Sequence, residues 1–157
     1  MNLLFFLTPK SEVLCVDSRD TVRQVMERME YHTYQAIPMI DSYGHYVGTI
    51  TEGDILWWIK DDLPFDMKKA ETEYIGNIPR KRENLPVRIR SDMEDLMSKA
   101  VNQNFVPVVD DKDIFIGIIT RKDIIQYLDR QRKENNQAVA EGCTEAGENR
   151  NEQELTV

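Results

Sequence analysis

Two short segments of the sequence carry residues suited to binding a phosphorylated ligand, Gly48-Thr-Ile-Thr-Glu-Gly-Asp54 and Gly117-Ile-Ile-Thr-Arg-Lys-Asp123. Each places a T-x-x-D motif directly after an apolar run, where a strand would lead into a helix. The first N–H groups of a helix lack intrahelical partners and attract anions. A threonine hydroxyl and an aspartate carboxylate can bond phosphate and ribose groups there. The same motif also forms a capping box without any ligand, so the pattern alone leaves both interpretations open.

The two junctions differ in charge between the threonine and the aspartate. The second holds Arg121 and Lys122, whereas the first holds Glu52 and Gly53. Cations at a helix start oppose the helix dipole, and an anionic ligand would remove that penalty. We therefore predict that the junction at 120–123 is the primary phosphate site and that the junction at 51–54 is the weaker one.

The two junctions belong to a longer internal repeat. The offset of 69 residues between them also relates Ala36-Ile-Pro-Met-Ile40 to Phe105-Val-Pro-Val-Val109. At an offset of 71, two apolar quartets match and have the i, i+3, i+4, i+7 spacing of an amphipathic helix. The quartets are Val22, Val25, Met26, Met29 and Met93, Leu96, Met97, Ala100. Repeats of this length indicate one structural unit present twice.

The order of elements within each unit follows from these patterns. A short strand precedes each amphipathic helix, at 13–16 and at 85–89, and Ser91-Asp-Met-Glu94 reads as a capping box for the second helix. Two apolar runs then flank turn residues at 41–44 and at 110–113, which predicts hairpins. A further helix follows each T-x-x-D, at about 52–60 and 121–131. The unit is therefore β-α-β-β-α.

The domain organisation follows from the repeat. We expect a first repeat at 1–60, a connector at 61–77, a second repeat at 78–131, and an acidic disordered tail at 132–157. From residue 134 the tail has six glutamates against one arginine and no sustained apolar period, so it cannot bury enough surface to offset the entropy of ordering. Neither repeat can enclose a core alone, so the two should pack face to face.

Composition excludes several classes of function. The net charge of −8 does not favour nucleic acid, and no apolar run reaches the length of a membrane span. Cys15 and Cys143 make neither a disulfide framework nor a metal site, which fits a cytoplasmic protein. His32 and His45 form no metal site or catalytic triad with neighbouring motifs. We expect no enzyme activity, no metal and no cofactor beyond a regulatory ligand.

The apolar-x-Pro strand and the G-x-I-T-x-x-D junction, repeated in register over about residues 6–131, resemble the CBS domain, and two copies resemble the paired CBS module. The resemblance implies an α+β fold of two β-α-β-β-α repeats packed face to face with pseudo-twofold symmetry, in a flat homodimer. It also implies adenine-containing ligands in clefts between the repeats.

The resemblance further implies two sets of ligand-binding residues, since the T-x-x-D of one repeat faces the first strand and the pre-proline residues of the other. The primary cleft would comprise Val13, Leu14, Gln35, Ala36, Ile37, Thr120, Arg121, Lys122 and Asp123. The secondary cleft would comprise Thr51, Gly53, Asp54, Asn84, Leu85, Asn104, Phe105 and Val106. Gln35 departs from the small hydroxyl residue common before the apolar-Pro strand of the family.

The expected function is that of a regulatory module. It would bind AMP, ADP, ATP or cyclic di-AMP and signal occupancy to a separate effector protein. The alternative is a dimerising scaffold with vestigial clefts. The basic cluster Arg80-Lys-Arg82 is interpreted as a solvated face that could also rim a phosphate cleft. Of the adjacent Trp57 and Trp58, we expect one in the core and one at a subunit contact, because a helix cannot direct both to one face.

Overall fold

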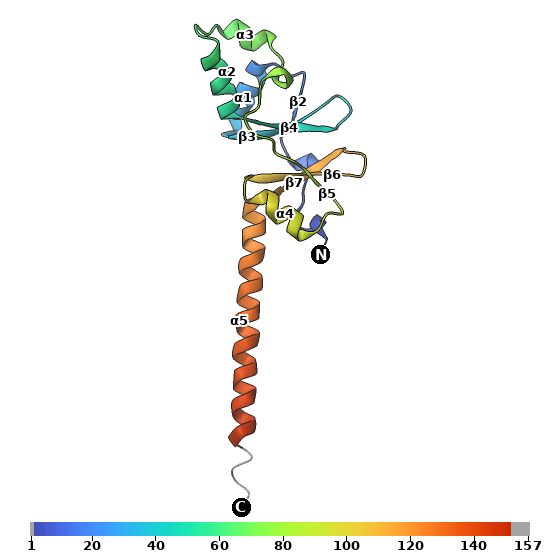
Figure 1. Cartoon of the computed structure of the whole chain (residues 1–157), viewed down its shortest axis with the longest axis vertical. Helices are drawn as coiled ribbons and strands as arrows, with labels where there is room; N and C mark the ends of the chain where they lie inside the picture. Colours follow the sequence, from blue (N-terminus) through green and yellow to red (C-terminus); the bar gives the residue numbers. More distant parts are fainter. Residues whose placement is uncertain (1, 152–157) are drawn as a thin grey trace, which may run out of the picture. The chain divides into compact units, whose positions relative to one another are not determined.

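The computed structural model describes residues 2–151 and the side chains as far as residue 142. The chain forms two units, residues 1–121 and 122–157, which are described separately. The first unit contains two sheets, ordered β2-β3-β4 and β1-β7-β6-β5. In Figure 1 the two sheets lie one above the other, with α1 and α2 outside the first sheet and α4 outside the second. This is the predicted arrangement of two repeats packed face to face.

The elements of the first repeat and the connector begin with a 3-10 turn, η1 (Leu3–Phe6), whose Leu3 is buried. The others are β1 (Thr8–Pro9), η2 (Lys10–Glu12), β2 (Val16–Asp17), α1 (Val22–His32), β3 (Ala36–Ile40), β4 (Tyr46–Thr51), α2 (Glu52–Asp61), α3 (Met67–Thr72) and η3 (Ile75–Asn77). The predicted strand at 13–16 is displaced, since β2 begins at Val16. The predicted connector at 61–77 contains a helix, α3.

The second repeat comprises β5 (Val87–Arg88), α4 (Met93–Ala100), β6 (Phe105–Val109) and β7 (Phe115–Thr120), followed by α5 (Arg121–Asn151). The cap of α4 differs from the prediction by one residue. Asp92, not Ser91, is the N-cap, and its Oδ1 accepts from Asp95 N at 2.8 Å. In the first repeat, Thr21 and Gln24 form a capping box at the start of α1.

The two hairpins have the same register, as the 69-residue offset predicts. Ala36 pairs with Thr51 as Phe105 pairs with Thr120, and the register shifts after Met39 and after Val108. The turn position with positive φ is Gly44 in one hairpin and Asp113 in the other. The hairpins also touch each other, since Tyr46 N donates to Asp113 O and Phe115 N donates to Gly44 O. These two main-chain hydrogen bonds join the two repeats.

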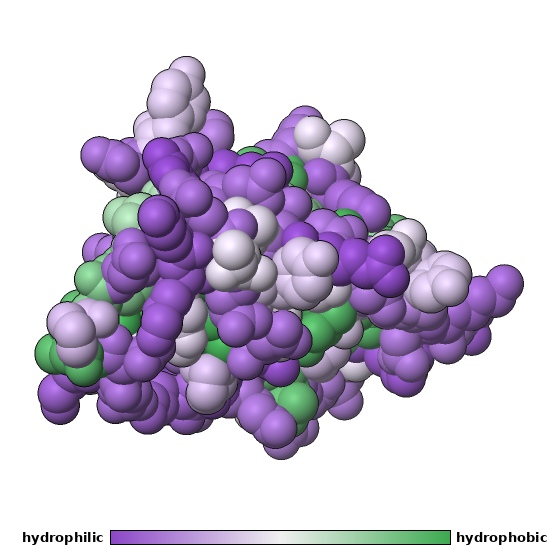
Figure 2. All heavy atoms as spheres, turned by 90° about the horizontal axis from the view of Figure 1, so that it is seen from above, coloured by the Kyte–Doolittle hydropathy of each residue, from purple (hydrophilic) through white to green (hydrophobic). Residues whose placement is uncertain are grey.

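Apolar side chains from both repeats fill the interior, as the two quartets predict. Val22, Val25 and Met29 of α1 are buried, as are Leu96 and Ala100 of α4. The first-repeat cluster continues through Ile37, Met39 and Ile50 of the hairpin. The face shown in Figure 2 is mainly hydrophilic, with small separate apolar areas, in keeping with a net charge of −8.

The strand β1 precedes the helix of the first repeat in the sequence but belongs to the sheet of the second repeat. β1 pairs antiparallel with β7, joining Thr8 to Ile118 and Pro9 to Gly117, so a segment before the first repeat's helix completes the second repeat's sheet. Gly117 permits the close approach of the two strands, since a Cβ there would overlap the carbonyl oxygen of Thr8. Sequence periodicity did not predict β1, because it is two residues long and its partner is distant in the sequence.

The helix α5 is longer than predicted. It runs to Asn151, whereas we expected a helix ending near 131 and disorder at 132–157. The structure therefore differs from the prediction as far as Asn151, and residues 152–157 lie outside the described residues. The segment has no core-forming period, but its Ala, Gln and Glu residues have high helix propensity. Asp129 adds ion pairs along the helix, 3.1 Å to Arg132 and 2.8 Å to Lys133.

Candidate functional site

A pocket of about 540 Å³ in the first unit gathers most of the residues predicted for the secondary cleft. Six of those eight predicted residues line it, namely Thr51, Gly53, Asp54, Asn84, Asn104 and Phe105. The remaining two lie elsewhere: Val106 is fully buried in β6, and Leu85 is 55% exposed. The pocket volume is within the range of small-molecule sites, which is roughly 300–1,000 Å³.

The T-x-x-D junction at the start of α2 forms one wall of the pocket. Thr51 is the N-cap of α2: its Oγ1 accepts from Asp54 N at 3.1 Å, and Asp54 Oδ2 accepts from Thr51 N at 3.0 Å. The other carboxylate oxygen, Oδ1, accepts from Lys81 N at 3.0 Å. Asp54 is only 5% exposed, yet both of its oxygens are hydrogen-bonded. The capping-box interpretation of this motif is therefore correct, and the junction also lines a pocket.

The segment before β5 supplies positive charge to the same pocket. Lys81 and Arg82 line it, while Arg80 bonds Val47 O through its guanidinium at 3.1 Å. We call residues 79–84 the basic strap. It is held to the first repeat by Lys81 N on Asp54, by Arg80 on Val47, and by Tyr46 OH, which donates to Asn84 O at 2.7 Å. With Arg121 also in the lining, the pocket has three cations against one carboxylate, in an acidic chain.

Arg121 has a structural role that the sequence analysis did not foresee. Its Nε donates to Ala100 O at 2.9 Å and to Gln103 O at 3.2 Å, and its Nη2 donates to Val101 O at 3.3 Å. These carbonyls lie at the C-terminus of α4, where a cation is favourable. The predicted penalty for a cation at the start of α5 is therefore offset within the chain, without requiring a ligand. Arg121 nevertheless lines the pocket.

Aromatic and amide side chains complete the wall. Phe105 and Trp57 are the aromatic members, and Asn84, Asn102, Gln103 and Asn104 are the amides. Trp58 packs against the first-repeat core and edge-on to Phe65, with ring centroids 5.8 Å apart, whereas Trp57 is 43% exposed. One tryptophan is thus at the core as predicted. The other lines the pocket, and its predicted place at a subunit contact stays a prediction.

A tyrosine behind the pocket joins the strap to the first repeat. Besides its bond to Asn84 O, Tyr46 OH lies 2.8 Å from Thr49 Oγ1, and Thr49 lines the pocket. Burial raises the pKa of Tyr46 to about 12, although the hydrogen bond with Thr49 and the charge of Arg80 act in the opposite direction. The phenol therefore stays protonated in the folded protein at pH values where it ionises in the unfolded chain.

The raised pKa of Tyr46 predicts a loss of stability at high pH. Below pH about 10 both states hold the phenolic proton, whereas between about 10 and about 12 only the unfolded state releases it. The free energy of unfolding should fall in this window by about 2 kcal/mol more in the wild type than in Tyr46→Phe. Urea unfolding at several pH values measures this. Tyr43→Phe, whose ring is 82% exposed, is the control and should fall in parallel with the wild type.

The residues predicted for the primary cleft are spread over several places. Ala36 and Arg121 line the pocket already described, and Gln35 lines a separate groove between α1 and α2. Ile37 is fully buried in β3, and Leu14 packs against the first-repeat core. Val13 follows η2 and Thr120 ends β7. Lys122 and Asp123 belong to the second unit, so the primary site stays a prediction.

Seven of the lining residues were not predicted. They are Thr49, Trp57, Lys81, Arg82, Val101, Asn102 and Gln103. The basic cluster at 80–82 was noted for its charge, but it was interpreted as a solvated face that could also rim a phosphate cleft. Val101 and Asn102 follow α4 in a segment without periodicity, so nothing in the sequence indicated their position.

The sequence matches a known protein family over most of its length. The CBS domain family matches residues 7–61 and 75–130, which together are more than half of the chain. The chain belongs to the CBS domain family. Its two matched segments correspond to the two repeats that the 69-residue offset predicted.

Solved CBS structures resemble most of the chain. A structure of CbpB in complex with cyclic di-AMP is 25% identical, covers 88% of this chain and 91% of that chain, and has a TM-score of 0.76. A CBS domain protein from Streptococcus pneumoniae is 25% identical, covers 82% of this chain and 86% of that chain, and has a TM-score of 0.75.

A longer relative contains a similar region. Inosine-5'-monophosphate dehydrogenase of Methanocaldococcus jannaschii is 29% identical over 115 residues, which is 73% of this chain but only 21% of the dehydrogenase. The chain thus spans about a fifth of the length of that relative, and the similarity does not extend to the rest of the enzyme.

Within residues 2–151, no helix combines the length and apolar character needed to cross a membrane. The described side chains likewise include no group of three or more His, Cys, Asp or Glu residues arranged to hold a metal ion.

Proposed function

We propose that this CBS protein is a regulatory module that binds an adenine nucleotide in the pocket between α2, the basic strap and the start of β6. The observation that carries the proposal is the lining itself. Three cations, a T-x-x-D helix start and two aromatic side chains enclose about 540 Å³. That combination suits a ligand with a phosphate and a flat ring.

Each part of the ligand has complementary groups in the pocket. Lys81, Arg82 and the N-terminal amides of α2 would bind the phosphate, since cations and helix starts both attract anions. Gly53 is a lining residue at the second position of α2, and it leaves those amides accessible. A carboxylate oxygen has two lone pairs, so Asp54 can accept a ribose hydroxyl while keeping its bonds to Thr51 N and Lys81 N. Phe105 would contact the base.

The similarity to CbpB supports this assignment. That protein was solved in complex with cyclic di-AMP and shares 25% of its aligned residues with this chain. We propose AMP, ADP, ATP and cyclic di-AMP as the candidate ligands. A regulatory role requires that the ligand stabilise one arrangement of the protein over another. The basic strap is the segment whose position would depend on occupancy, because its residues Lys81, Arg82 and Asn84 line the pocket.

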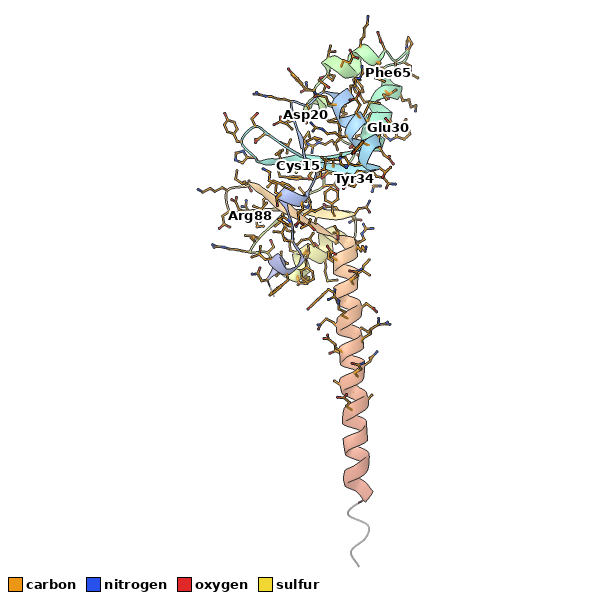
Figure 3. All side chains as sticks on the ribbon, turned by 180° about the vertical axis from the view of Figure 1, so that it is seen from behind. Cys15, Asp20, Glu30, Tyr34, Phe65 and Arg88 are labelled. Atoms are coloured by element: carbon orange, nitrogen blue, oxygen red, sulfur yellow. The ribbon has the colours of Figure 1, made fainter. Side chains whose placement is uncertain are left out.

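We propose that the signal passes to a separate effector protein and that the module is a homodimer. The apolar groove between α1 and α2 supports the dimer. It is lined by Met26, Met29, Ile55, Leu56 and Ile59, and rimmed by Glu30 and Tyr34, which are labelled in Figure 3. Leu56 is 56% exposed and Tyr34 is 48% exposed, so the groove offers apolar surface for a second copy.

Isothermal titration with AMP, ADP, ATP and cyclic di-AMP tests the binding proposal. We expect saturable heat with at least one of the four. Adenosine is the control ligand because it lacks the phosphate, and a single charge-assisted hydrogen bond contributes about 1.5–3 kcal/mol. AMP should therefore bind at least about tenfold more tightly than adenosine. No heat with any of the four ligands, on protein with a cooperative unfolding transition, would refute the proposal.

A dimerising scaffold is the alternative function, and one observation favours it. Both oxygens of Asp54 and the guanidinium of Arg121 are already hydrogen-bonded within the chain. A pocket satisfied in this way could be a remnant of a ligand site. Sedimentation analysis separates the two functions: a dimer that shows no heat with any nucleotide would favour the scaffold.

A further inference from the structure

Gln103 has an unusual hydrogen-bonding state. It lies between α4 and β6 and is only 8% exposed. Its Nε2 donates to Leu85 O at 3.3 Å, which fixes the orientation of the amide. Among the described residues, Gln103 Oε1 is the one buried side-chain nitrogen or oxygen atom without a hydrogen-bond partner. Buried polar side chains are nearly always paired, so this acceptor calls for a donor.

The donor does not come from the cations nearby. Arg121 bonds the main-chain oxygen of Gln103 and the carbonyls of Ala100 and Val101. Lys81 and Arg82 line the same pocket as exposed side chains, and neither forms a bond to the amide. Because Gln103 lines the pocket, a donor brought by the ligand can satisfy the amide oxygen.

The chemistry of the ligand limits which group that donor can be. Phosphate oxygens are acceptors at neutral pH, so they cannot donate a hydrogen bond to the amide oxygen. Both kinds of oxygen carry negative partial charge and would repel each other. Ribose hydroxyls suit the carboxylate of Asp54, a buried acceptor in the lining. The hydroxyl of Thr49, which is also buried there, already pairs with Tyr46 OH. The remaining donor of a nucleotide is an amino group on the base.

We propose that Gln103 selects the base: its Oε1 accepts a hydrogen bond from the 6-amino group of an adenine ring. The inference rests on the proposed nucleotide function and adds a side chain that distinguishes between purines. Hypoxanthine and guanine carry an oxygen at position 6, so either base would place two acceptors against each other. A site that leaves a buried polar group unpaired discriminates against the ligand that fails to pair with it.

Titration with AMP and IMP tests the inference, because these two nucleotides differ only at and beside position 6 of the ring. The wild type should bind AMP at least about tenfold more tightly than IMP, a difference of about 1.4 kcal/mol. GMP should be as weak as IMP. Gln103→Met keeps the length of the side chain and removes the acceptor. In this variant the preference for AMP over IMP should fall to within about threefold, through weaker binding of AMP.

Gln137→Met is the matched control, because it makes the same substitution at an exposed position of α5 that does not line the pocket. It should retain the wild-type preference for AMP. Circular dichroism confirms that each variant is folded. If Gln103→Met does not fold, the wild-type comparison still decides, since equal binding of AMP and IMP overturns the inference. That result would leave the nucleotide function standing, whereas a failure to bind any adenine nucleotide would contradict the nucleotide function itself.

Discussion

Gly117→Ala is expected to lower the free energy of unfolding by about 3 kcal/mol, which combines backbone strain with overpacking. Gly117 has φ +157, and an added Cβ would overlap the backbone oxygen of Thr8 and lie 2.8 Å from Leu7 Cδ1. Neither strand can move aside without breaking the pairing of Pro9 with Gly117. Urea unfolding followed by circular dichroism measures the change.

The repeat provides a matched control for this variant, because Gly48 occupies the equivalent position of the first hairpin. A Cβ at Gly48 would overlap only the end of the Arg80 side chain, which is flexible and can move away. Gly48→Ala should therefore stay within about 1 kcal/mol of the wild type. Equal losses in the two variants would contradict the assigned role of β1.

The double variant Lys81→Glu/Arg82→Glu is expected to weaken binding of AMP by at least about 100-fold. Each charge-assisted hydrogen bond to a phosphate contributes about 1.5–3 kcal/mol, and two such bonds would be lost. The introduced carboxylates would also repel the phosphate across the same pocket. Titration calorimetry measures the affinity. The main-chain bond of Lys81 to Asp54 involves no side chain of the strap and should survive.

Arg88→Glu/Arg90→Glu is the control for charge, since it makes the same change in net charge away from the pocket. Arg88, labelled in Figure 3, extends from β5 and bonds Asp113 at 2.8 Å, while Arg90 lies 3.3 Å from Asp111. Exposed ion pairs of this kind contribute little to stability. AMP affinity in this variant should change by less than about fivefold. A loss as large as that of the strap variant would mean that only the overall charge matters.

The repeat itself could be predicted in detail from the sequence, because its evidence is local. Apolar spacing in Val22–Met29 fixed a helix, and the run 36–40 with its partner 105–109 fixed the central strands. Because the two hairpins are related by the 69-residue offset, the same register is expected in both. Six of the residues predicted for the secondary cleft meet at one pocket for the same reason, since each is tied to a strand end or a helix start.

What could not be predicted depends on contacts between distant segments. The bonds of Arg121 to α4 and the burial of Gln103 arise only when β7 and α4 are packed together. The basic strap has no periodicity, so the hydrogen bond between its main chain and Asp54 could not be predicted from the sequence. The segment 132–151 shows a different limit. Its composition indicated that it lacks the pattern of a core, but a helix can form without one where residues have high helix propensity.

The pairing of β1 with β7 has a consequence for biosynthesis. Thr8 leaves the ribosome long before Ile118, its partner, has been synthesised. During that interval the first hairpin can form from neighbouring residues, whereas β1 has no partner strand to pair with. Contacts between residues so far apart in sequence slow folding, because a long loop must close before they form. The second repeat therefore completes its sheet last, with a strand that was synthesised before either hairpin.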